Sequence, residues 1–389
     1  MIRHIIKLIW NKKGNNGLML LEIFLAFIVL SAVLSYVLYN TDRLGLPVGF
    51  ETEDRWAVFL ERTDPDVDSA SIAEMKNSLK LSLQGMDNVE SVAFSNSVSP
   101  FGGSTWSTTN DDMGFEIRTR YAMVNEDFEK TMGSNVIEGR WFEESDAYAA
   151  FEPIIVNKYF ADRYFPDIPL LDSIITINGE KKVVGIVDDY RYGGIFEEEQ
   201  ETSLLYLPHT DNMASVVYLK MAKNTPASYE EEVSKMIESV TKTSGFVIQD
   251  LDVLRSRRER ETWIPMIALL SISGFLCLNV ALGLFGVLWY TINKRKSEIG
   301  LRRAMGAHSN NIAQQFTFEI LILTGIAILA GTFFAVQVPL LKLINIENMI
   351  FYRAILFSAL IILIIVLICA LYPSHQASRI HPATALHED

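Results

Sequence analysis

The chain has 389 residues, a net charge of −13 and 49% hydrophobic residues, and its mean hydropathy of +0.19 is high for a water-soluble protein. The apolar residues gather in four blocks separated by polar sequence. Residues 41–262 carry 22 Lys and Arg against 41 Asp and Glu. A segment this acidic is a poor nucleic-acid binder, because it repels phosphates.

The N-terminal part predicts a membrane anchor. Residues 1–17 contain four Lys and Arg and no acid, which is typical of a cytoplasmic segment. Residues 18–39 form the first apolar block, which is long enough to cross a bilayer. No small-residue cleavage site precedes Asn40. We therefore predict an uncleaved transmembrane helix at 18–39.

Residues 40–262 predict a large domain of mixed helices and strands. Apolar residues at helical spacing predict a helix over 72–83 and another over 233–240. Thr225 is the expected N-cap of the second helix, with Pro226 in its first turn. Asn157 is expected to cap a short helix that runs through Phe165.

Short apolar runs in the same domain predict strands. They lie at 89–94, 154–156, 174–177, 182–187, 203–207, 216–220 and 246–248. Asn178-Gly179 predicts a type I′ turn between two of them, because both residues accept the positive φ angles that this turn requires. The stretch 97–110 is rich in Gly, Ser and Thr and is predicted to be a mobile loop.

Three further apolar blocks predict membrane spans at 263–290, 312–338 and 349–372. They leave a loop at 291–311, a short outer loop at 339–348 and a tail at 373–389. The loop 291–311 is basic, so it is expected in the cytoplasm together with residues 1–17, which places 40–262 outside.

One feature opposes this orientation. Arg255, Arg257, Arg258 and Arg260 lie immediately before the second span, on its predicted outer side. Long domains are translocated with little regard to their charge, so the predicted orientation stands. The fold class is therefore an α+β integral membrane protein, with four transmembrane helices and a large mixed α/β extracytoplasmic domain between helices 1 and 2.

Two acidic residues lie within predicted spans. Glu22 is near the start of the first span and Glu319 is near the start of the third, both close to the cytoplasmic interface. An acid inside a membrane is costly and marks a functional hypothesis by default. The simpler interpretation is that each carboxylate reaches the interface or pairs with a nearby basic residue.

The loop 291–311 holds the most distinctive segment. Glu298 and Arg302 are spaced as an i,i+4 ion pair, so a short helix is predicted that Gly306 ends, and Ser309 begins the next helix. This helix would present an apolar surface that needs a partner, formed by Ile299, Leu301 and Met305. Gly300 indicates a close backbone approach, because glycine inside a helix is otherwise unfavourable. The predicted site comprises Glu298, Ile299, Gly300, Leu301, Arg302, Arg303, Ala304, Met305, Gly306 and Ala307.

Several stretches together resemble one known family. Pro153–Asn157, Tyr164–Pro166 and Val184–Gly193, preceded by Gly139–Phe142, resemble the MacB-like periplasmic core domain. The segment 294–307, Lys-Arg-Lys-Ser-Glu-Ile-Gly-Leu-Arg-Arg-Ala-Met-Gly-Ala, resembles the FtsX-type loop between the second and third spans, and the tail resembles the family's ending. The chain thus resembles the permease subunit of a MacB/FtsX-type ABC transport system.

The resemblance implies a bacterial inner-membrane protein with its large domain in the periplasm. In the family, the loop helix is a coupling helix that docks on an ABC ATPase, which acts in two copies. A second permease subunit, identical or related, and membrane lipid are further expected partners, and a periplasmic adaptor is a candidate partner. No nucleic-acid partner is expected. The chain itself would bind no cofactor, while the partner ATPase uses ATP.

The implied function is to couple ATP hydrolysis to motion of the periplasmic domain, for export or efflux of a peptide, a drug or a lipoprotein. The alternative is an FtsX-like regulator that uses the same mechanotransmission to switch a cell-wall hydrolase. A sensor receptor fits less well, because it would have two spans and a kinase. Glu22 and Glu319 alone do not make a membrane enzyme.

Catalytic and metal motifs are absent from the sequence. No G-x-x-x-x-G-K-[ST] phosphate loop, H-E-x-x-H, C-x-x-C or G-x-S-x-G occurs in the 389 residues. We therefore predict no catalytic site, no metal site and no ATPase within these residues. Cys277 and Cys369 lie in apolar blocks and are expected to be packing residues.

Overall fold

The computed structural model describes residues 13–61, 68–96, 98–102, 105–110, 116–208, 211, 214–305, 308–344 and 346–378. The chain divides into two compact units, a membrane unit of residues 1–42 and 263–389 and an outer unit of residues 43–262. The α+β membrane-protein fold class is confirmed, since four helices are long and apolar enough to span a bilayer and the outer unit is built on a mixed sheet.

The membrane unit contains α2 (Lys13–Thr41), most of α7 (Leu251–Lys294), α8 (Lys296–Ala304), α9 (Ser309–Ala335), α10 (Gln337–Leu340) and α11 (Asn348–Ser378). The predicted span at 263–290 is only part of α7, which begins at Leu251. The residues that precede the span are charged but favour helix, and Arg255 pairs with Glu259 one turn later at 2.7 Å. The charged residues show where the apolar span begins, but the helix itself begins before them.

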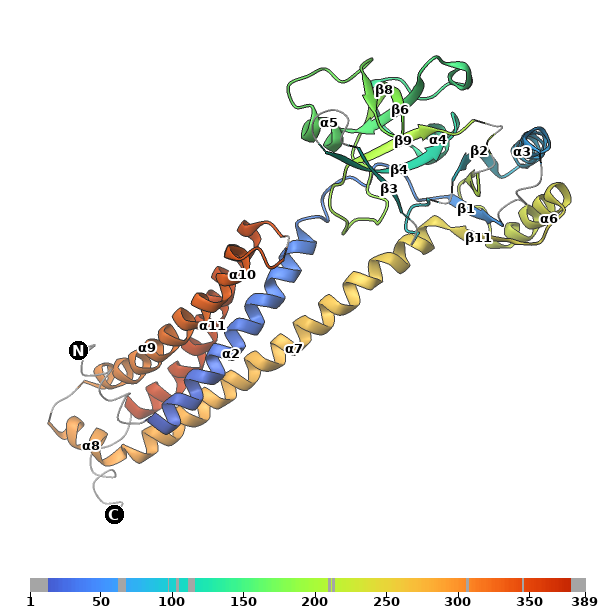
Figure 1. Cartoon of the computed structure of the whole chain (residues 1–389). Helices are drawn as coiled ribbons and strands as arrows, with labels where there is room; N and C mark the ends of the chain where they lie inside the picture. Colours follow the sequence, from blue (N-terminus) through green and yellow to red (C-terminus); the bar gives the residue numbers. More distant parts are fainter. Residues whose placement is uncertain are drawn as a thin grey trace. The chain divides into compact units, whose positions relative to one another are not determined.

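Helices α2, α9 and α11 pack against one another (Figure 1). Ile23 and Phe27 of α2 are fully buried in the shared core. Gly331 of α9 lies against Phe27, so that a Cβ added there would stand 2.3 Å from a ring carbon. A glycine at this point therefore lets α9 approach α2 closely, as small residues do in membrane helix pairs.

Replacement of Gly331 by leucine should separate α9 from α2. We expect the free energy of unfolding to fall by about 1–3 kcal/mol, because the added side chain overlaps the Phe27 ring. Gly325→Leu is the matched control on the same helix, since a Cβ at Gly325 meets nothing within 4 Å. Thermal unfolding of the two purified variants in one detergent measures the difference, and equal midpoints would contradict this packing.

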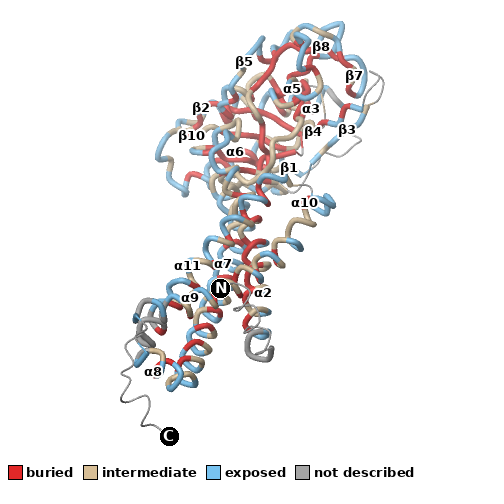
Figure 2. Tube along the Cα trace, turned by 90° about the vertical axis from the view of Figure 1, so that its left-hand side faces the viewer, coloured by how far each residue is buried: buried red, intermediate tan, exposed pale blue. Residues whose placement is uncertain are grey.

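The outer unit is built on one sheet of eleven described strands. The strands are β1 (Arg55–Leu60), β2 (Val89–Ser95), β3 (Trp106–Asn110), β4 (Ile117–Val124), β5 (Val136–Gly139), β6 (Glu152–Asn157), β7 (Ile174–Thr176), β8 (Glu180–Val187), β9 (Thr202–Tyr206), β10 (Val216–Met221) and β11 (Phe246–Asp250). The helices and 3-10 turns are α3 (Ser69–Gln84), α4 (Phe128–Met132), η1 (Glu144–Tyr148), α5 (Lys158–Tyr164), η2 (Ala227–Tyr229) and α6 (Glu230–Thr241). Figure 2 shows that the strands carry most of the buried residues of this unit.

The sheet has two halves. One half has the order β11-β1-β10-β2 and consists of two β-α-β units, with α3 and α6 packed on it. The other half has the order β4-β9-β6-β8-β5, with β3 and β7 paired to its strands. A single residue pair, Ser95 with Val124, joins the halves. Side chains extend this junction, because Asn125 accepts from the amide of Phe94 at 2.9 Å and Asn96 accepts from that of Met123 at 3.3 Å.

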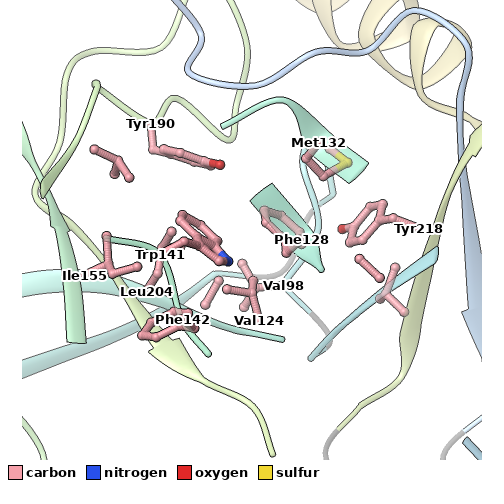
Figure 3. Packing of buried hydrophobic residues seen from close by; sticks show 14 of the residues in the cluster. Val98, Val124, Phe128, Met132, Trp141, Phe142, Ile155, Tyr190, Leu204 and Tyr218 are labelled. Atoms are coloured by element: carbon pink, nitrogen blue, oxygen red, sulfur yellow. The ribbon is translucent and has the colours of Figure 1, made fainter. Parts of the chain in front are cut away.

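An aromatic core lies beside this junction. Phe128 of α4 stacks on Trp141 at 6.3 Å between ring centroids and meets Tyr218 edge-on at 5.5 Å. Figure 3 shows these rings converging with Tyr190 and Phe142, which come from loops that follow other strands. Aromatic rings fill the irregular space between the two halves with large apolar area, so this cluster fixes how the halves meet.

Several local predictions are confirmed. Asn178 and Gly179 have φ angles of 50° and 104° and join β7 to β8, as a type I′ turn requires. Asn157 caps α5 by accepting from the amide of Phe160 at 3.2 Å. Asp68, which was not predicted as a cap, performs the same role for α3.

Two local predictions are wrong. The stretch 97–110 is not wholly a loop, because Trp106–Asn110 forms β3 and pairs along its whole length with β4. Cross-strand pairing decides this, and such pairing is not visible in a short Ser/Thr-rich sequence. Thr225 does not cap α6, which begins at Glu230 after the turn η2. The Thr225 hydroxyl instead donates to the carbonyl of Ala222 at 2.6 Å.

Candidate functional site

The candidate site is α8, the short helix between the second and third spans (Figure 1). Only Arg295 separates α7 from α8, and the amide of Ile299 already donates to the carbonyl of Arg295 at 3.0 Å. After α8 the chain enters α9 at Ser309, with His308 as the N-cap residue and no side-chain cap. The predicted short helix is therefore present, and both of its neighbours are long helices.

Polar side chains of α8 and of Arg295, the residue before it, contact α9. Arg295 pairs with Glu319 at 3.4 Å, and both side chains are largely buried. Arg302 donates to the side chain of Gln315 at 2.9 Å and pairs with Glu298 at 2.5 Å. Because Gln315 and Glu319 are one turn apart on α9, Arg302 and Arg295 contact the same face of that helix. The Glu298–Arg302 pair follows from the sequence, whereas Gln315 was not foreseen as a partner.

The two faces of α8 differ in exposure. Ile299 is only 3% exposed and Gly300 is also buried, whereas Leu301 is 52% and Met305 is 73% exposed. The prediction that Ile299 forms part of an outward apolar surface is therefore wrong, because it packs within its own chain. Gly300 likewise lies on the inner face. The outward apolar surface consists of Leu301 and Met305, one helical turn apart, beside the exposed Ala304.

Part of the predicted site lies outside the described residues. Gly306 and Ala307 are not described, and nothing is described of the Arg303 side chain.

The two intramembrane acids have different surroundings. Glu319 pairs with Arg295, as described above. Glu22 of α2 lies against Gly283 of α7, where an added Cβ would stand 2.8 Å from a Glu22 carboxylate oxygen. No ion pair joins Glu22 to a residue that the structure describes. The carboxylate therefore packs where α2 meets α7, and a larger residue at Gly283 would displace it.

A buried arginine in the outer unit is a feature that sequence reasoning missed. Arg191 is 0% exposed, and all the acceptors of its guanidinium among the described residues are main-chain carbonyl groups. The acceptors are Pro47 at 2.8 Å, Ile195 at 2.9 Å, Arg43 at 3.2 Å, Glu197 at 3.3 Å and Leu46. Burial lowers the pKa of the guanidinium, while the nearby Glu199 and Glu197 act to raise it.

Residues 43–50, which we call the anchor segment, are bound at further points along their length. Arg43 pairs with Glu198 at 2.6 Å, and Val48 accepts from the amide of Arg191 at 2.9 Å. Gly49 has a φ of 89° and lies so close to the carbonyl of Asp189 that a Cβ would be 2.2 Å from it. The anchor segment directly follows the first span in sequence, so Arg191 fixes the start of the outer unit. The Val184–Gly193 motif was the available signal, and it was interpreted only as strand and turn.

No group of three or more His, Cys, Asp or Glu residues among the described ranges is arranged to hold a metal ion. The arrangement at α8 is a short helix with one face packed on its own chain and an exposed apolar pair, Leu301 and Met305, on the other.

Comparisons with known proteins identify the family. A family described as the MacB-like periplasmic core domain matches residues 23–236, which is more than half of the chain. A second family, described as the FtsX-like permease C-terminal domain, matches residues 270–382.

Curated relatives are larger proteins. The macrolide export ATP-binding/permease protein MacB of Bartonella quintana is 25% identical over 288 residues, covering 68% of this chain and 42% of that protein. The MacB of Bartonella henselae is 26% identical over 290 residues, covering 69% and 42%. The chain thus spans about two fifths of the length of these relatives.

Solved structures with some likeness are isolated outer domains. The periplasmic region of MacB from Actinobacillus actinomycetemcomitans has a TM-score of 0.38 at 14% identity, covering 54% of this chain and 94% of that structure. The extracellular domain of the ABC-type transporter YknZ from Gram-positive bacteria has a TM-score of 0.35 at 16% identity, covering 50% and 99%.

The family, the four spans and the mixed outer domain agree with one another. They describe a multi-pass protein of the bacterial inner membrane with a periplasmic domain between its first and second spans. The chain belongs to the MacB/FtsX-type permease family, with a MacB-like periplasmic core domain and an FtsX-like permease domain.

Proposed function

We propose that this chain is the permease subunit of an ABC transport system, and that α8 receives the motion of a separate ATPase. The observation that carries the proposal is the two-sided character of α8. Arg302 on its inner face and Arg295 immediately before it contact α9, and its outer face exposes Leu301 and Met305. When a helix is bonded to a neighbouring helix, its displacement is transmitted to that neighbour. ATP-driven displacement of α8 would therefore be transmitted to α9 and α7.

The ATPase would act as a separate subunit in two copies. No phosphate-binding loop occurs in the 389 residues, whereas the MacB relatives are named as ATP-binding and permease proteins. The chain itself would then bind no cofactor, and ATP would be used by the partner. The motion would reach the periplasmic domain and drive export or efflux of a peptide, a drug or a lipoprotein.

A second permease subunit would pack against α7. Only 17% of the most apolar stretch of α7 is buried within the chain, compared with 39% in α2. Phe275, Asn279, Leu282 and Gly286 lie on one exposed face of α7 at helical spacing. Asn279 is near mid-span, where a polar side chain facing lipid is unfavourable. This face therefore favours another helix as its neighbour over lipid, with lipid surrounding the remainder.

Purification of the tagged chain from its native membrane tests the proposal. We expect a Walker-type ATPase to co-purify, and we expect two permease subunits and two ATPase subunits in the complex when its mass is measured. The complex should hydrolyse ATP. Purification of the permease without any ATPase, under conditions that preserve other membrane complexes, would contradict the proposal.

A related function in the same family is an FtsX-like regulator of a cell-wall hydrolase. The match of residues 270–382 to the FtsX-like permease domain is the observation that favours it. Both functions use the same motion at α8 and differ only in what the periplasmic domain acts on. Deletion of the gene separates them, because a regulator predicts defective cell separation without a change in drug or peptide tolerance. A periplasmic adaptor would be expected for the efflux function.

A further inference from the structure

The two edge strands of the periplasmic sheet differ in how far they are protected from pairing with another strand. The terminal strands of the sheet are β5 and β11. Strand β5 is short and contains a register shift between Val136 and Glu138, which are features that protect a sheet edge from pairing. Strand β11, Phe246–Asp250, pairs in regular register with β1 and has no bulge, proline or lysine. Among the described residues it has no strand on its other side.

The hydrogen bonds of β1 show which backbone amides and carbonyls of β11 have no partner strand. The amide of Leu60 donates to Ser215 beyond β10, and that of Glu61 donates to Gly245 beside β11. Even-numbered residues of β1 therefore face β10 and odd-numbered residues face β11, since direction alternates along a strand. In the observed register Val247 and Gln249 then bond to β1. The amide and carbonyl of Ile248 point to the open edge.

A cleft opens beside the same strand. It has a volume of about 480 Å³, which lies within the usual range for ligand sites. Trp56 pairs with Asp250 across the sheet, and Ile248 is two residues from Asp250, so these three side chains share one face. Ile248, Trp56 and Leu254 give the cleft an apolar lining on that face.

The charged side chains that line the cleft differ in whether they already interact within the chain. Arg257 lines it from the second turn of α7 and is exposed, with no ion-pair partner among the described residues. Two acids also line it: Glu230 lies in the first turn of α6, where the helix dipole already favours a negative charge, and the Asp250 carboxylate accepts from the amides of Asp252 and Val253 at the start of α7. Arg257 is therefore the group that is available to bind an opposite charge on a ligand.

We propose that β11 and this cleft form a docking site for an extended segment of a second periplasmic protein. The segment would add a strand to the sheet by pairing with Ile248, place an apolar side chain in the cleft, and bring an acidic residue to Arg257. A polypeptide is favoured over a lipid or drug, because the open edge offers backbone donors and acceptors at strand spacing. A partner protein is favoured over transported cargo, because an open edge contacts one side of the segment and leaves the rest of that protein outside.

Synthetic peptides test the site on the full chain in nanodiscs without any ATPase. The probes are fluorescent Val-Thr-Val-Thr-Leu-Asp-Asp, its Lys-Lys counterpart, and both peptides with N-methylated valines. We expect the acidic peptide to bind about tenfold more tightly than its N-methylated form, because methylation removes strand hydrogen bonds. Hydrogen exchange of residues 246–250 should slow when it binds.

Variants of two exposed arginines provide the matched comparison. Arg257→Glu should reverse the preference from the acidic to the lysine peptide, while Arg260→Glu should leave both affinities within about twofold, because Arg260 does not line the cleft. No binding of the acidic peptide at about 1 mM, or binding that is insensitive to N-methylation or to Arg257→Glu, would overturn the proposal. Because no ATPase is present, that failure would leave the proposed permease function untouched.

Discussion

Substitution of both Leu301 and Met305 by aspartate is expected to abolish recruitment of the ATPase. A docked short helix gains most of its affinity from a few apolar side chains in the partner's groove, and each such side chain contributes about 2 kcal/mol or more. Placing a carboxylate at both positions removes that contribution and adds the cost of burying two charges. We expect association to weaken by about 100-fold or more, which is measured by co-purification and by ATP hydrolysis of the reconstituted complex.

The exposure of both residues makes this experiment interpretable. Because Leu301 and Met305 are 52% and 73% exposed, the double variant should fold and insert as the unchanged protein does, which gel filtration can verify. Leu81→Asp is the matched control, since Leu81 is 70% exposed on α3 of the periplasmic domain. Full ATPase activity in the double variant would refute docking at α8.

Arg191→Met is expected to destabilise the periplasmic domain strongly. The substitution keeps an unbranched side chain but leaves five main-chain carbonyl groups without their buried donor. Hydrogen bonds to a charged group contribute about 1.5–3 kcal/mol each, and buried unpaired acceptors carry a further cost. Allowing for partial relaxation, we expect the free energy of unfolding to fall by about 3–5 kcal/mol.

Local unfolding of the Arg191→Met variant should begin at the anchor segment. Arg43 is paired with Glu198 and its carbonyl accepts from Arg191, so trypsin should cut after Arg43 much faster in the variant. Arg118→Met is the control, because Arg118 is exposed on β4 and its side chain makes no ion pair with a described residue. Equal thermal midpoints and equal cleavage in both variants would show that Arg191 does not hold the anchor segment.

The coarse architecture could be predicted because it depends on composition along the chain. Four apolar blocks and two basic segments suffice for four spans and their orientation, since both depend on the cost of placing charge in lipid. Local motifs with their own geometry were also predictable, such as the Asn178-Gly179 turn and the Asn157 cap.

Features that depend on distant contacts were not predictable. Strand β3 forms because β4 is beside it, and the start of α7 at Leu251 lies far from the apolar boundary that its sequence shows. The sequence alone does not distinguish Arg191 from an arginine on the surface. The fold brings the carbonyl groups of the anchor segment around it. Tertiary context overrides local preference in each case.

The sequence predicted the position of α8, but it did not predict which face of that helix is exposed. The spacing of Glu298 and Arg302 predicts the helix, yet it does not show which face turns inward. That depends on Gln315 and Glu319 of α9, which draw the two arginines to one side and bury Ile299 and Gly300 with them. The proposed docking surface is therefore smaller than the sequence indicates, and it centres on the exposed Leu301 and Met305.

Cross-linking from position 305 tests the central claim most directly. A photoreactive benzophenone side chain replaces Met305 in the full chain, in intact cells, and the cross-linked product is identified by mass spectrometry. We predict a covalent product between this chain and a Walker-type ATPase, and no such product from the same side chain at Leu81. Products from position 305 that contain only lipid or a periplasmic protein would contradict the account.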